Sequence, residues 1–272
     1  MTYALERWAS DLAGWGIPDE ILQAAPESPW GFPPELLRRR AEIAAALEPT
    51  ASIRRALEAL PEGGTALDVG AGGGAASVPL APRAARIVGV DTSPETLEGF
   101  VEEATAAGAV AETVVGRWPD VAPSVDVADV VVCNHVLYNV PELEPFARAL
   151  DEHAHRRVVI EITATHPLAW MSDLWMRFHD LERPTHPTAD DACEALAELG
   201  LDVRRDDELR PPRAAGFSDR ADAVSLVRRR LCLQPERDDE LAEALGPRLA
   251  ERDGLWSAGP IEQRVVALWW DV

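Results

Sequence analysis

Lysine is absent from this sequence of 272 residues, so all 26 of its basic residues are arginines. Together with abundant alanine and proline, this bias indicates a high-GC bacterial genome. Cysteine is scarce, and the odd number of three gives no basis for a disulfide framework, so we expect a reducing compartment, the cytoplasm. Long hydrophobic runs are also missing. Without about 18 consecutive apolar residues the chain has no candidate membrane span, and we predict no membrane partner.

Metal-binding motifs are missing too. The six histidines form neither an H-x-x-x-H nor an H-E-x-x-H unit. The cysteines include no pair at the spacing of a zinc site. We therefore predict that the protein binds no metal.

The charge balance is strongly acidic, with a formal net charge of −21 at pH 7. A chain of this charge repels phosphate backbones, so we predict that neither RNA nor DNA is a partner. A salt-adapted source would also produce such acidity. The simpler interpretation is a solvated acidic surface with no meaning for partners.

The most informative stretch is an apolar strand over residues 65–69 that runs into a glycine-rich turn over residues 70–74. Glycine adopts positive φ at little cost, and its missing side chain allows a ligand to approach the backbone. A helix is predicted to follow over residues 75–81. A second apolar strand ends at Asp91, and a carboxylate at such a strand tip accepts hydrogen bonds from both hydroxyls of a ribose.

The pattern Asp68-x-Gly70-x-Gly72-x-Gly74 resembles the acidic glycine motif of class I S-adenosylmethionine (SAM)-dependent methyltransferases, and Asp91 is similar to their ribose-binding acid. The same turn also fits the dinucleotide fingerprint G-x-G-x-x-G/A. The acid two residues before the first glycine favours the methyltransferase. An NAD-dependent oxidoreductase and a non-catalytic SAM-binding protein remain as alternatives.

Predicted strands and helices alternate beyond this motif, which is typical of a parallel sheet. The resemblance implies an α/β fold, with a seven-stranded, mostly parallel Rossmann-like sheet in the order 3-2-1-4-5-7-6. Its last strand is antiparallel, and helices cover both faces. We expect an N-terminal helical cap over residues 1–61, including a helix over residues 35–47. A SAM-binding domain follows over residues 62–272, with helical insertions at about 163–187 and 211–260.

Functional side chains of a parallel sheet lie beyond the carboxyl ends of its strands. The resemblance places the glycine turn at the methionine part of SAM and Asp91 at the ribose. After the third strand the sequence departs from the family pattern, which often has an acid there. Trp118 either packs against the adenine instead or lies in the core. The predicted cofactor-binding residues are Asp68, Gly70, Ala71, Gly72, Gly74, Asp91, Thr92, Arg117, Trp118 and Asn134.

His135 is the candidate catalytic residue, because it follows the fourth strand where similar families carry a polar pair. A purely structural histidine is the alternative. Glu161, after the fifth strand, is a weaker candidate. An aromatic wall over the acceptor is one interpretation of the many tryptophans, and filling of a core is the other. The predicted acceptor-facing residues are Tyr138, His166 and Trp170, and the proposed wall adds Trp8, Trp15, Trp30 and Trp175.

These observations predict a SAM-dependent methyltransferase that acts on a small molecule. Methyl transfer from a sulfonium is a displacement in which the protein mainly supplies position and approach angle. A general base is needed only when the nucleophile must lose a proton. The sequence leaves open the acceptor, the atom that is methylated, and whether the protein is a monomer or a homodimer.

Overall fold

The computed structural model describes residues 3–33, 36–39, 42–43, 48–210, 216–260 and 262–272. At its centre is a seven-stranded sheet in the order β3-β2-β1-β4-β5-β9-β6. The strands β1 to β5 run parallel to one another, and β9 is antiparallel to both β5 and β6. The strand bounds are β1 Gly64–Val69, β2 Ala84–Asp91, β3 Val110–Val115, β4 Ala128–Asn134, β5 Ala154–Thr163, β6 Arg204–Arg210 and β9 Gln263–Asp271.

This topology confirms the predicted order and the antiparallel last strand. The central strands are buried on both faces, because successive side chains of a strand point to opposite sides. In β1, Ala66 packs into one hydrophobic core and Leu67 into the other. Helices therefore cover both faces of the sheet, as the sequence predicts.

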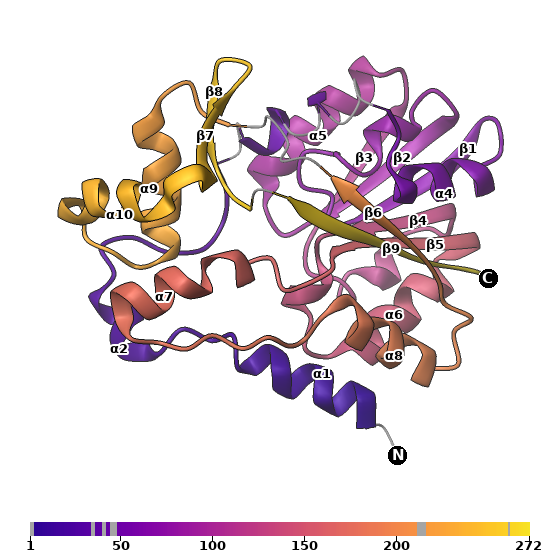
Figure 1. The fold of residues 1–272 in the computed structure, drawn as a ribbon. Helices are drawn as coiled ribbons and strands as arrows, with labels where there is room; N and C mark the ends of the chain where they lie inside the picture. Colours follow the sequence, from indigo (N-terminus) through magenta and orange to yellow (C-terminus); the bar gives the residue numbers. More distant parts are fainter. Residues whose placement is uncertain (1–2, 34–35, 40–41, 44–47, 211–215, 261) are drawn as a thin grey trace.

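Helices lie against both faces of the sheet and form its outer layers (Figure 1). On one face, Ile53 and Phe100 bring α4 and α5 onto the sheet. On the other face, Trp8, Phe146 and Ala192 do the same for α1, α6 and α8. The bounds are α1 Tyr3–Ala13, α4 Ala51–Ala59, α5 Pro94–Ala106, α6 Leu143–Glu152 and α8 Ala189–Glu198.

A third hydrophobic core lies beside the sheet and joins N-terminal residues to both insertions (Figure 1). Ile17, Trp175 and Val227 are among its buried members. The two segments that the sequence analysis assigned to insertions contain helices, and the second one also contains a two-stranded hairpin that the sequence analysis missed. The elements are α2 Asp19–Ala24, α7 Ser172–His179, α9 Arg220–Arg230, α10 Asp238–Leu245, β7 Leu249–Arg252 and β8 Leu255–Ala258.

One predicted helix is wrong. Residues 75–81 form turns and a short 3-10 helix over Val78–Leu80 instead of an α-helix. Pro79 lies in this segment, and because it has no backbone N–H it cannot make the i to i−4 bond of an α-helix. Of the predicted helix over residues 35–47, residues 36–39 and 42–43 are helical, and the others lie outside the described part. No helix among the described residues is long and apolar enough to cross a membrane.

Candidate cofactor and acceptor site

A cavity of about 980 Å³ lies at the carboxyl ends of the central parallel strands. Val69, Asp91, Asn134 and Glu161 bring the ends of β1, β2, β4 and β5 to its wall. Ligands of open α/β sheets bind at this edge, and the volume is at the upper end of the range for small-molecule sites. The cavity is therefore the candidate functional site.

The glycine-rich turn forms one wall of the cavity. Gly72 has a φ of 52°, and a side chain added there would meet nothing within 4 Å, so its backbone is open to a ligand. At Gly73 the opposite holds, because an added Cβ would lie 2.9 Å from the carbonyl oxygen of Leu37. The N-terminal segment at residues 37–38 thus lies directly against the turn. Gly70, Ala71 and Gly72 all line the cavity, whereas Gly74 does not.

Asp91 links the end of β2 to this turn. Its Oδ2 accepts a hydrogen bond from the backbone N–H of Gly72 at 2.9 Å, and its Oδ1 accepts one from Ser93 at 3.0 Å. Asp91 and the neighbouring Thr92 both line the cavity. The carboxylate is therefore fixed in position before any ligand arrives.

Asp68 lies behind the turn and is not among the residues that line the cavity. It is fully buried, and its Oδ2 accepts a hydrogen bond from the Ser77 hydroxyl at 2.6 Å. Burial raises the pKa of Asp68 to about 7, an effect that the Ser77 hydrogen bond opposes and the Asp91 charge reinforces. Asn134 does line the cavity, and its buried Oδ1 has no hydrogen-bond partner among the described residues.

The segment after β3 supplies both an aromatic and an acid. Trp118 lines the cavity and is only 5% exposed, so the two interpretations of this residue are not exclusive. Its Nε1 donates to the carbonyl oxygen of Phe146 at 3.4 Å. Arg117 also lines the cavity, and so does Asp120. The expected lack of an acid here is wrong, because Asp120 follows Trp118 by two positions and reaches the wall.

His135 and Glu161 form the polar pair of the cavity wall. The Nε2 atom of His135 lies 3.1 Å from Oε1 of Glu161, and the His135 side chain is half exposed while that of Glu161 is 3% exposed. The backbone of His135 has a φ of 61°, in the left-handed region that is rare for residues other than glycine. Such strained positions cluster at functional sites.

Glu161 is held on both oxygens. Arg210 donates from Nη1 to Oε1 at 2.9 Å and from Nη2 to Oε2 at 2.7 Å, and the Ser52 hydroxyl also donates to Oε2. Burial would raise the pKa of Glu161, but its contacts with His135 and Arg210 outweigh this effect and hold that pKa far below its ordinary value. Glu161 is therefore an ionised carboxylate inside the protein. The sequence analysis ranked it only as a weaker candidate for a site residue.

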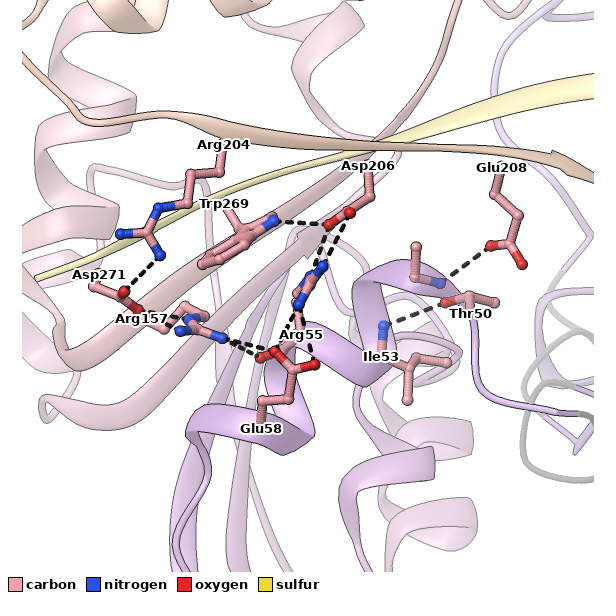
Figure 2. A network of polar contacts seen from close by, with 11 residues as sticks. Thr50, Ile53, Arg55, Glu58, Arg157, Arg204, Asp206, Glu208, Trp269 and Asp271 are labelled. Carbon is pink, nitrogen blue, oxygen red and sulfur yellow. Dashed lines mark hydrogen bonds and ion pairs between the residues drawn. The ribbon is translucent and has the colours of Figure 1, made fainter.

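Ile53 of helix α4 and the residue that precedes this helix, Thr50, line the cavity wall. The Thr50 side chain caps this helix by accepting from the Ile53 N–H at 3.3 Å. Figure 2 shows how the next turn of the helix is tied to the sheet: Arg55 donates to both oxygens of Asp206, at 2.7 and 3.0 Å, and the Trp269 indole donates to the same carboxylate at 2.9 Å. This network fixes the start of α4 at the cavity.

The predicted acceptor-facing residues lie elsewhere. The Tyr138 hydroxyl is buried and donates to the Thr163 carbonyl at 2.8 Å. His166 stacks on Trp15 with ring centroids 3.7 Å apart, and burial lowers its pKa to about 3, so it stays neutral. Trp170 packs against the third core. None of these lines the cavity, because their side chains are used in packing.

The proposed aromatic wall is corrected in the same way. Trp8 and Trp15 are at most 5% exposed and donate their indole N–H groups to backbone carbonyls, and Trp175 lies in the third core. Trp30 is 51% exposed but does not reach the cavity. The aromatic side chain that the N-terminal segment does bring there is Phe32, which the sequence analysis did not single out.

Comparison with known proteins agrees with this architecture. Residues 37–205, more than half of the chain, match the model of the Methyltransferase domain family, so the chain belongs to this family. It is a SAM-dependent methyltransferase, which sets aside the NAD-dependent oxidoreductase and the non-catalytic binder. None of the curated proteins compared with the sequence matches it.

Solved structures share the fold at low sequence identity. A cyclopropane-fatty-acyl-phospholipid synthase-like protein from Lactobacillus casei matches with a TM-score of 0.53 and 16% identity, covering 93% of this chain and 98% of that one. A putative methyltransferase from Bacillus halodurans matches with a TM-score of 0.52 and 13% identity, covering 82% of this chain and 99% of that one.

Proposed function

We propose that this methyltransferase acts on a small-molecule acceptor whose nucleophilic atom gives up its proton to His135. The observation that carries the proposal is the contact between Nε2 of His135 and the buried, ionised Glu161 at 3.1 Å in the cavity wall. A carboxylate in this position fixes the tautomer and orientation of an imidazole base.

The residues of the cavity fit SAM. Asp91, already oriented by Gly72, would accept from the ribose hydroxyls, and the unpartnered Oδ1 of Asn134 would accept from the ammonium group. Asp120 would meet the adenine amino group, and Trp118 would flank the base. Asp68 would support the turn through Ser77 without touching the cofactor.

The chemistry divides simply between cofactor and protein. SAM, when bound, supplies an electrophilic methyl group and leaves as S-adenosylhomocysteine. The Nε2–H group of His135 donates a hydrogen bond to Glu161 and keeps its proton. In the neutral ring the lone pair is therefore on Nδ1. Nδ1 takes the proton of the acceptor as the new bond to the methyl carbon forms, and Glu161 stabilises the resulting imidazolium.

This mechanism restricts the acceptor. A nucleophile that starts without a proton, such as a tertiary amine or a thioether, needs no base, whereas a hydroxyl does. The partly enclosed cavity suits a small molecule, and the net charge of −21 opposes a nucleic acid. We therefore infer methylation of a hydroxyl group on a small molecule.

The test is to incubate the protein with SAM and separate sets of small hydroxyl compounds, carboxylates and tertiary amines, and to measure S-adenosylhomocysteine by mass spectrometry. We expect turnover within the hydroxyl set that exceeds the background without an acceptor. Turnover confined to the amine set would refute the proposal, since no base is needed there.

A further inference from the structure

The part of the cavity wall that SAM leaves free has a distinct composition. With the glycine turn, the β2 end and residues 116–120 assigned to the cofactor, two parts of the wall remain: the segment that follows His135, over residues 136–146, and the N-terminal side. The N-terminal side offers the apolar side chains of Phe32, Leu37 and Ile53, and His135 lines the same cavity. An acceptor placed here would have an apolar body and a reactive group near the base.

Phe32 is the aromatic member of this group, and the second insertion holds it in place. Its side chain is 41% exposed and is not buried in a hydrophobic core, and it lines the cavity. The Arg230 guanidinium lies 4.5 Å from the centroid of its ring. The carbonyl oxygen of the preceding Gly31 accepts hydrogen bonds from Arg229 at 3.1 Å and from Arg230 at 2.8 Å. Helix α9 therefore positions the ring at the cavity from behind.

The charges around the cavity disfavour an anionic acceptor. The carboxylates that line it outnumber the arginines, since Arg117 is the one arginine among the described lining residues. Arg210 neutralises one of these acids, Glu161, but is already used in that pair. Like charges repel strongly in a partly enclosed site. The acidic lining residues are Asp91, Asp120, Glu142 and Glu161.

The base adds a chemical restriction. A phenol hydroxyl has a pKa of about 10, whereas an aliphatic alcohol resembles water, with a pKa of about 16. General-base catalysis is effective when the pKa of the group that loses the proton is not far above that of the base. An imidazole therefore suits a phenol far better than an aliphatic alcohol. An aromatic ring also pairs favourably with the ring of Phe32.

We propose that the acceptor is an uncharged aromatic alcohol of the phenol type, and that Phe32, held by Arg230, determines this specificity. The inference rests on the proposed function, because it uses His135 as the base. It assigns acceptor selection to a contact between the N-terminal segment and the second insertion, the two regions that lie largely outside the family match at residues 37–205.

The test uses three probes built on the same fused bicyclic ring framework: 2-naphthol, decahydro-2-naphthol and 2-naphthoate. Their binding to the full chain is measured by calorimetry in the presence of S-adenosylhomocysteine. We expect 2-naphthol to bind at least tenfold more tightly than the saturated alcohol and the carboxylate. Equal or tighter binding of either of these two would overturn the proposal, and so would a failure of 2-naphthol to bind.

The variants are Phe32→Ala and Phe32→Tyr, with Trp30→Ala as the matched control, since Trp30 is an exposed aromatic of the same segment outside the cavity. Phe32→Ala should weaken 2-naphthol about tenfold with unchanged S-adenosylhomocysteine affinity, and Phe32→Tyr should restore it. Trp30→Ala should change neither. Unchanged 2-naphthol affinity in Phe32→Ala would contradict the assignment.

His135→Asn separates this inference from the proposed function. If both hold, His135→Asn still binds 2-naphthol with an affinity that depends on Phe32, but methylates it far more slowly. Undiminished methylation by His135→Asn, with binding that still depends on Phe32, would refute the base while the aromatic site stands. If 2-naphthol affinity does not depend on Phe32 while His135→Asn methylates slowly, the aromatic site alone is refuted.

Discussion

Arg210 at the end of β6 reaches Glu161 of β5 through two hydrogen bonds, Nη1 to Oε1 at 2.9 Å and Nη2 to Oε2 at 2.7 Å. The strand β9 lies between β5 and β6 in the sheet. The orientation of the proposed base therefore depends on β6, which supplies Arg210, and on β9, which lies between β6 and β5. It does not depend on the parallel strands β1 to β5 alone.

The first prediction concerns this pair. Both side chains are buried, and removing one partner of such a pair leaves an unpaired charge inside the protein. We expect Arg210→Leu to lower the free energy of unfolding by about 3–5 kcal/mol, measured with urea. Arg205→Leu on the same strand removes exposed ion pairs with Asp190 and Asp207 and should cost at most about 1 kcal/mol. Equal effects of the two substitutions would show that Glu161 does not need Arg210.

The second prediction is a pH dependence from Asp68. Burial raises its pKa from 3.8 to about 7, so between these values the folded carboxyl keeps a proton that the unfolded one has lost. Stability is therefore lost as the pH rises from about 4 to about 7. The neutral amide of Asp68→Asn avoids this loss. It should be more stable than the wild type at pH 8, by up to about 4 kcal/mol, and nearly equal at pH 4. A difference that does not vary with pH would contradict the raised pKa.

The third prediction tests the ribose-binding role of Asp91. Losing a hydrogen-bonded carboxylate costs about 1.5–3 kcal/mol of binding free energy. Calorimetric titration should show that Asp91→Ala binds SAM at least tenfold more weakly than the wild type. Glu98→Ala, an exposed acid on the neighbouring helix α5, serves as the control and should bind normally. Normal binding by Asp91→Ala would remove this residue from the site.

The fourth prediction follows from the placement of Trp170 against the third core. Because the indole packs there and not at the cavity, Trp170→Ala should lower the free energy of unfolding by about 2 kcal/mol. Affinity for S-adenosylhomocysteine and the rate of methyl transfer should stay unchanged. A variant of normal stability with a slower reaction would instead restore Trp170 to the acceptor site.

The parts of the fold that the sequence predicts are those with local signals. Apolar strands and the glycine turn between them are readable because strand burial and positive φ each demand particular residue types. The strand order came from the family resemblance and agrees with the structure. The helix predicted over residues 75–81 failed because Pro79 opposes it.

The acceptor side of the site was harder to predict, because contacts between distant segments create it. Glu161 gains its importance from Arg210 and Ser52, which are far away in the sequence. Phe32 lines the cavity, and α9 holds the chain beside it at Gly31 through a contact that no local pattern predicts. The tryptophans misled the sequence analysis for a different reason. A large aromatic side chain indicates burial, but the sequence does not say in which core the side chain is buried.

The most direct test of the account is the single-turnover rate of methyl transfer to 2-naphthol, measured by rapid mixing of saturating SAM with wild type, His135→Asn and His155→Asn. His155 is an exposed histidine of β5 outside the cavity lining and serves as the control. We predict that His135→Asn slows the transfer by about 10²–10⁴-fold with unchanged SAM affinity, while His155→Asn has no effect. A His135→Asn rate equal to that of the wild type would contradict the central claim that His135, oriented by Glu161, is the base.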